Sequence, residues 1–102
     1  MIKLKTYRLA LEFYKEGRKL KIKNFPLKNQ FERASLSIVL NIAEGVAKLS
    51  AKDRKRFYQI SLGSLNETLV ILEIMENNIL IKKGNLVRAH LINLIKNPGG
   101  FS

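Results

Sequence analysis

Residues 57–75, FYQISLGSLNETLVILEIM, decide the fold class of this chain. Apolar side chains recur in this stretch at steps of three and four, the period of an α-helix, and form two neighbouring rows. One row contains Phe57, Ile60, Ser64, Ile71 and Met75, and the other contains Tyr58, Leu62, Leu65, Leu69 and Leu72. Because the two rows together exceed what one neighbouring helix covers, the stretch predicts a helix packed against several partners.

Two other helical segments precede this one. The first covers residues 4–20, where two apolar rows again follow steps of three and four. Residues 21–26 predict a loop, because proline disfavours helical geometry in the residue before it and cannot donate a backbone hydrogen bond. The next helix is expected to begin near Pro26 or Leu27 and to continue to Gly45 on the same spacing.

Asn41 and Gly45 interrupt the apolar row of this second helix. An asparagine on such a row can fix the register between helices, and a glycine permits close approach of two backbones. The alternative is a helix end that frays into a loop. We expect the structural role for both residues.

The third helix is expected to begin after Ser50, which can form a capping box with Asp53, and to end at Asn77 and Asn78. Asn85 is expected to cap a short fourth helix, which the sequence at 97–100 ends. Four amphipathic helices with short connections and no strand pattern predict an all-α, antiparallel up-and-down four-helix bundle. At 102 residues, the chain is expected to form a single domain, residues 1–102.

The composition favours a globular, strongly basic protein. Hydrophobic residues make up 46% of the chain, and its formal net charge of +11 would attract a polyanion. With no cysteine, the chain has no disulfides, thiolate nucleophiles or sulfur-ligated zinc. No apolar run approaches the ~20 residues of a membrane span, and the amino terminus does not resemble a signal peptide. We therefore expect a cytoplasmic location. An anionic membrane surface is an alternative partner for the positive charge, but the apolar faces are expected to be used in the bundle, so we expect no membrane partner.

No residue pattern predicts catalysis. His90 is the only histidine, and a Glu-x-x-His pair is ruled out because Val87 lies three positions before it. Glu67, Glu73 and Glu76 lack a companion base, nucleophile or phosphate-binding loop, so they are expected to be solvated or to meet another subunit. We expect no enzyme activity, catalytic residues, metal site or cofactor.

The basic residues form two clusters. The first contains Lys15, Arg18, Lys19, Lys21 and Lys23, and the second contains Lys48, Lys52, Arg54, Lys55 and Arg56. In an antiparallel bundle they can be neighbours or mark opposite ends, and the geometry of an oligomer would decide which surface they share. Cations without a sequence-reading motif are expected to contact phosphates, which predicts salt-sensitive, weakly selective binding of nucleic acid. The alternative is a merely solvated basic surface.

Residues 30–45, QFERASLSIVLNIAEG, resemble the signature of four-helix-bundle proteins encoded in intervening sequences of 23S ribosomal RNA genes. The string NIAEG at 41–45 is its most specific part. Other matches follow the family's pattern in the same order: Phe25, Pro26, Gln30, Arg33, Ala34, Ser37, Phe57, Gly63, Ser64, Leu65 and Glu67. The resemblance covers most of the chain.

The resemblance implies a homo-oligomer, typically a pentamer, with no known enzyme activity and an RNA or DNA association. It makes Asn41, Glu44 and Gly45 structural or interface residues. Gly63 and Ser64 are expected to let a neighbouring helix approach closely. A related branch comprises accessory proteins of diversity-generating retroelements, which implies as an alternative an adaptor that binds a reverse transcriptase.

Overall fold

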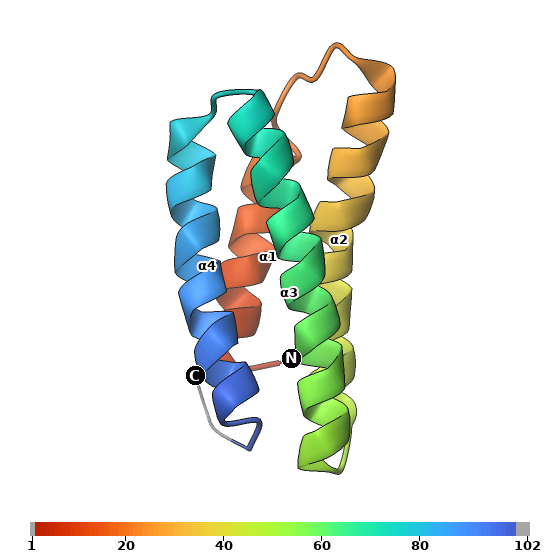
Figure 1. Ribbon diagram of the computed structural model, residues 1–102, viewed down its shortest axis with the longest axis vertical. Helices are drawn as coiled ribbons and strands as arrows, with labels where there is room; N and C mark the ends of the chain where they lie inside the picture. Colours follow the sequence, from red (N-terminus) through yellow and green to blue (C-terminus); the bar gives the residue numbers. More distant parts are fainter. Residues whose placement is uncertain (1, 100–102) are drawn as a thin grey trace.

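Four antiparallel α-helices form an up-and-down bundle in the computed structural model, which describes residues 2–99 (Figure 1). The helices are α1 (Lys5–Gly17), α2 (Phe25–Ala47), α3 (Ala51–Ile74) and α4 (Asn78–Lys96). Each packs against two others, so that α1 and α3 both contact α2 and α4. The all-α bundle predicted from the apolar spacing is confirmed.

The pair formed by α2 and α3 is the longest part of the bundle. These helices contain 23 and 24 residues, whereas α1 contains 13. At about 1.5 Å per residue, α2 and α3 therefore run well beyond α1. The molecule measures 42 × 23 × 21 Å, and the turn between α2 and α3 projects at one end of its long axis (Figure 1).

The core contains most residues of the rows that the sequence indicates, whereas Ile60 of α3 and Leu86 of α4 are exposed. Tyr58, Leu65 and Leu72 of α3 are buried, and Leu62 and Leu69 are partly buried against the same core. From α1, the row containing Ala10, Phe13 and Gly17 faces inward. The remaining fully buried large apolar residues come from α2 and α4: Phe31, Ile38, Ile42, Val87, Leu91 and Leu94.

Side-chain caps set three of the helix starts. The Ser50 hydroxyl accepts from the backbone N–H of Asp53 at 3.1 Å, as predicted. Asn24 caps α2 by accepting from Leu27 at 2.9 Å, so α2 begins at Phe25, slightly before the predicted start. Because Gly17 ends α1, the first helix is shorter than the spacing to residue 20 suggested.

The predicted start of the fourth helix is wrong. Asn77, and not Asn85, caps α4 by accepting from the N–H of Leu80 at 3.0 Å. Gly84 lies inside the helix, where a Cβ would approach Leu69 Cδ2 to 2.6 Å. Close packing against Leu69 of α3 and Phe13 of α1, and not a turn, therefore favours a glycine at this position.

The third helix ends through a left-handed residue. Glu76 has φ 57°, the backbone N–H of Asn77 donates to Leu72 at 3.0 Å, and that of Glu76 donates to Glu73 at 3.0 Å. These paired bonds are those of a Schellman motif. Asn77 and Asn78 lie at the connection between α3 and α4, but the left-handed backbone of Glu76 is what reverses the direction of the chain.

Gly45 has the structural role expected for it. A Cβ at this position would lie 2.6 Å from Cε1 of the Tyr58 ring, so glycine lets the end of α2 approach α3. Burial raises the pKa of Tyr58, and the nearby Arg54 guanidinium partly offsets this effect.

No helix within residues 2–99 is both long and apolar enough to cross a bilayer.

Candidate nucleic-acid interface

The two basic clusters lie at opposite ends of the bundle. The first surrounds the connection between α1 and α2, which we call the loop end, and the second surrounds the turn between α2 and α3, which we call the hairpin end (Figure 1). The full length of α2 separates them, about 34 Å at the helical rise. The structure thus decides between the two arrangements that the sequence left open.

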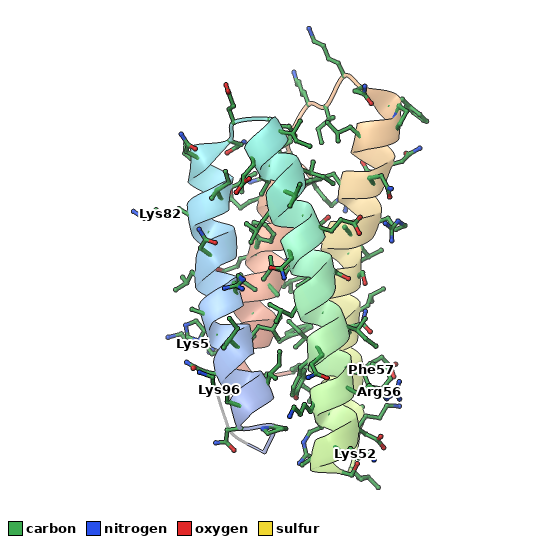
Figure 2. All side chains as sticks on the ribbon, in the orientation of Figure 1. Lys5, Lys52, Arg56, Phe57, Lys82 and Lys96 are labelled. Atoms are coloured by element: carbon green, nitrogen blue, oxygen red, sulfur yellow. The ribbon has the colours of Figure 1, made fainter. Side chains whose placement is uncertain are left out.

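The hairpin end carries exposed cations of α3, and the same half of the bundle carries cations of two other helices. Lys52, Lys55 and Arg56 are exposed on the first turns of α3. Lys5 opens α1 and Lys96 closes α4, and Figure 2 shows both in the same half of the molecule as Lys52 and Arg56. The charge clusters in the sequence did not include Lys5 or Lys96. The up-and-down topology could have placed them, because the first residue of α1 and the last of α4 fall at the end where α3 begins.

Few carboxylates oppose the cations of the hairpin end. Glu44 contacts Lys48 Nζ at 3.4 Å, one turn apart on α2. Asp53 lies in the first turn of α3, where a carboxylate stabilises the positive end of the helix dipole. None of Lys52, Lys55 and Arg56 forms a salt bridge within the described part of the chain. These three side chains are therefore available to an external anion.

Arg54 differs from its neighbours because backbone carbonyls hold its guanidinium. Its Nη1 donates to the carbonyl oxygens of Lys48 and Leu49 at 3.1 and 2.9 Å, and its Nε donates to that of Pro98 at 2.9 Å. Three of its five N–H donors are thus occupied. Arg54 ties the turn after α2 to the segment after α4, which shapes the hairpin end.

The Phe57 ring lies beside two cations of the hairpin end. The Arg56 guanidinium carbon lies 4.4 Å from the centroid of the Phe57 ring, and Lys48 Nζ lies 5.0 Å from it. Both distances are within the range of cation–π attraction. Figure 2 shows Arg56 and Phe57 beside each other on α3, with Lys52 nearer the turn. The half-buried ring therefore restrains Arg56 while its charge remains exposed.

The loop end has many cations but also more carboxylates. Its predicted members Lys15, Arg18, Lys19, Lys21 and Lys23 are all exposed. Lys82 and Lys83 at the start of α4 join them, and Figure 2 shows Lys82 in this half. Glu16 pairs with Lys83 at 3.4 Å. Glu32, Glu73 and Glu76 add negative charge nearby, which makes this end less uniformly positive.

The family signature lies where α2 meets α3. Asn41 Nδ2 donates to the Ser37 carbonyl oxygen at 2.9 Å and contacts Ser37 Oγ at 3.0 Å. The hydroxyls of Ser37 and Ser64 lie 2.8 Å apart and join the two helices. Gly63 faces open space, with no atom within 4 Å of an added Cβ. Within one chain, Asn41 and Ser64 thus have hydrogen-bonding roles, whereas Gly63 has no packing role.

Apolar side chains are exposed on the outer side of α2 and α3. Leu40, Ile60, Val70 and Ile74, which we call the apolar face, are exposed to 53%, 43%, 55% and 65%. On α3 they follow helical steps of three and four together with Gly63 and Glu67. Glu67 pairs with Arg33 of α2 at 2.8 Å and crosses this face. Of the apolar arc predicted for the third helix, only Ile60 is exposed, whereas the other members are buried or partly buried.

Other chemistry is sparse in the part of the chain that the structure describes. Residues 2–99 contain no group of three or more side chains able to hold a metal ion. His90 is half-buried on α4 and forms no hydrogen bond or ion pair among the described contacts. Glu73 and Glu76 are exposed, and Glu67 has its partner in Arg33.

The fold and its two cationic ends define a basic, antiparallel four-helix bundle. Residues 2–96 match the 23S rRNA-intervening sequence protein family. Because this match covers nearly the whole chain, the protein belongs to that family, which confirms the resemblance seen in residues 30–45. No curated protein matches the chain.

Proposed function

We propose that this protein is a non-enzymatic, homo-oligomeric bundle that binds RNA or DNA through phosphate contacts with little sequence specificity. The observation that carries the proposal is the group of free cations at the hairpin end, Lys52, Lys55 and Arg56, with Lys5 and Lys96 in the same half. Because few carboxylates oppose these cations, a polyanion gains attraction there without first displacing internal ion pairs.

Binding is tested by fluorescence anisotropy with labelled single-stranded RNA and duplex DNA across a salt series. The affinity is expected to fall steeply with salt, by a logarithmic slope of about 0.9 per phosphate contacted on duplex DNA. Different sequences of equal length are expected to bind similarly. Absence of binding at low salt overturns the proposal.

Charge-reversal variants compare how much each end of the bundle contributes to nucleic-acid binding. The variant Lys52→Glu/Lys55→Glu/Arg56→Glu is expected to lose more affinity and more of the salt slope than Lys19→Glu/Lys21→Glu/Lys23→Glu. Both variants change the net charge equally, so a difference between them reports position and not total charge. Equal losses would contradict a special role of the hairpin end.

The apolar face supports assembly of identical chains, and the family resemblance suggests a pentamer. Exposed apolar patches of this kind are typical of interfaces. Light scattering coupled to size exclusion is expected to show an oligomer that Ile74→Glu dissociates. The matched control is Ile79→Glu, because Ile79 is exposed to 74% on α4, outside this face. A monomeric native protein would overturn this part.

An adaptor for a reverse transcriptase is the second candidate. A groove between α1 and α4, lined by Leu9, Glu12, Phe13, Glu16, Lys83, Leu86 and Val87, favours it. Its apolar floor and acidic edge suit a basic amphipathic segment of another protein. If a reverse transcriptase is encoded beside this gene, the two purified proteins are expected to bind each other, with Glu12→Lys/Leu86→Glu weakening the complex. Full binding by that variant would argue against the groove.

A further inference from the structure

We propose that the loop end contains a pocket for a single unpaired nucleobase that has an exocyclic amino group. The pocket is a hollow of about 390 Å³ between α1 and α2, lined by Tyr14, Arg18, Asn29, Glu32, Arg33 and Leu36. The inference rests on the proposed nucleic-acid function and adds a base-recognition site to the phosphate contacts. It is separate from the free cations of the hairpin end.

Tyr14 and Leu36 provide the apolar surface of the hollow. The Tyr14 ring packs against the core on one side and remains partly exposed, so its position is restrained. Leu36 contributes an exposed aliphatic side chain from α2. A flat aromatic ring beside an aliphatic wall is a suitable platform for stacking a base.

Arg18 provides the positive charge next to this platform. Its guanidinium carbon lies 5.8 Å from the centroid of the Tyr14 ring, and it forms no salt bridge among the described residues. Because this guanidinium lies over the Tyr14 ring, a base that stacks there displaces it from the ring, and Arg18 can then neutralise the phosphate of that base. Exposed Lys19, Lys21 and Lys23 continue the positive charge along the chain from Arg18.

Arg33 forms a fixed wall of the hollow. Its Nε and Nη2 donate to Gln30 Oε1 at 3.1 and 2.8 Å, and Nη2 also contacts Glu67 Oε2 at 2.8 Å. These contacts hold the guanidinium in place and partly neutralise it. Arg33 therefore shapes the hollow more than it attracts phosphate.

Asn29 and Glu32 give the hollow its selectivity. Neither side chain forms a hydrogen bond with another described residue, and both are exposed at the edge of the hollow. A carboxylate only accepts hydrogen bonds, so it favours bases with amino donors, namely adenine, cytosine and guanine. Uracil has a carbonyl oxygen where cytosine has its amino group, so it offers Glu32 only the N3–H donor, which two carbonyl oxygens flank.

The hollow favours a single strand over a duplex. Stacking on Tyr14 requires an exposed base face, and contact with Glu32 requires a free Watson–Crick edge. Both are occupied in a duplex. The free cations of the hairpin end, by contrast, can bind either form through phosphates.

Tyrosine fluorescence tests the stacking directly. The chain has three tyrosines and no tryptophan, so Tyr7→Phe/Tyr58→Phe leaves Tyr14 as the only strong emitter. Short oligo(A) and oligo(C) RNA are expected to quench this emission more strongly than oligo(U) or duplex RNA. Unchanged emission on saturation with oligo(A) would overturn the inference.

Two substitution pairs test the individual contacts by anisotropy. Tyr14→Leu is expected to weaken oligo(A) binding roughly tenfold, whereas Tyr14→Phe retains it and Tyr7→Leu, on the same helix outside the hollow, has little effect. Glu32→Gln is expected to remove the preference over oligo(U), with Glu73→Gln, an exposed carboxylate of the loop end outside the hollow, as the control. Thermal melts identify a Tyr14→Leu variant that fails to fold, in which case Glu32→Gln and the quenching of Tyr14 emission decide.

The results distinguish failure of this inference from failure of the proposed function. If the native protein binds no nucleic acid at low salt, the proposed function itself is wrong. If it binds, but equally to oligo(A), oligo(U) and duplex, and Tyr14→Leu folds and binds normally, only the base pocket is wrong.

Discussion

At the scale of single residues, two glycines on neighbouring helices differ in the space that a side chain would find. A Cβ on Gly45 would overlap the buried Tyr58 ring, whereas a Cβ on Gly63 would meet no atom within 4 Å. Gly45→Ala is expected to destabilise the fold by about 1–3 kcal/mol through overpacking. Gly63→Ala is expected to stabilise it by about 0.5–1 kcal/mol, because glycine weakens a helix interior. Urea unfolding of the two variants checks both signs, and destabilisation by Gly63→Ala would reveal a contact that a single chain lacks.

Tyr58 is expected to make the stability of the fold depend on pH in the alkaline range. Burial raises the pKa of its phenol above the ordinary value of 10.0. Between that value and the raised pKa, the unfolded chain releases the proton while the folded chain retains it, so stability is lost as the pH rises through this window. Thermal melts of the native protein and Tyr58→Phe are expected to diverge above pH 10.0, with the variant less sensitive. Parallel curves would show that the phenol is not responsible.

At the scale of the helices, Asn77 is the N-cap of α4, whereas Asn85 resembles a cap only in the sequence. Asn77 accepts from the N–H of Leu80, whereas Asn85 is exposed in the middle of α4. Asn77→Ala is expected to cost about 1 kcal/mol, and Asn85→Ala is expected to be neutral or slightly stabilising. Chemical denaturation measures both, and the reverse order would place the start of α4 at Asn85 after all.

The end of α3 offers a stabilising substitution. Glu76 occupies the left-handed position of a Schellman motif, where a side chain is strained and glycine is usual. Glu76→Gly is expected to raise the free energy of unfolding by about 1 kcal/mol. Glu73→Gly, inside the last turn of the same helix, is the contrasting variant and should destabilise. A loss of stability in Glu76→Gly would show that its side chain has a stabilising contact.

Across the whole molecule, the net charge of +11 makes self-repulsion a general term in stability. Because salt screens this repulsion, the melting temperature is expected to rise with sodium chloride at low to moderate concentration. The hairpin-end variant Lys52→Glu/Lys55→Glu/Arg56→Glu, with a smaller net charge, is expected to rise less. An equal rise in both proteins would indicate a general salt effect and not relief of charge repulsion.

Spacing along the chain was sufficient to predict the number of helices, most of their inward-facing residues and the cap at Ser50. These properties depend on residues within a few turns of each other, and the period of a helix maps them directly onto one side. The net positive charge likewise follows from the composition alone. The predicted start of the fourth helix was wrong because Gly84 and Asn85 suit a turn locally, whereas close packing against Leu69 and Phe13 is what favours the glycine.

Only packing of distant segments decided which charged groups lie together and which are free. Arg54 looked equivalent to Lys55 in the sequence, yet it is tied to the carbonyl of Pro98, 44 positions away. The same packing separates the two clusters by the length of α2 and brings Lys5 and Lys96 to the half of the molecule in which α3 begins. Local sequence encodes helices because their hydrogen bonds are local, whereas a surface is made by residues that meet only after the helices have packed.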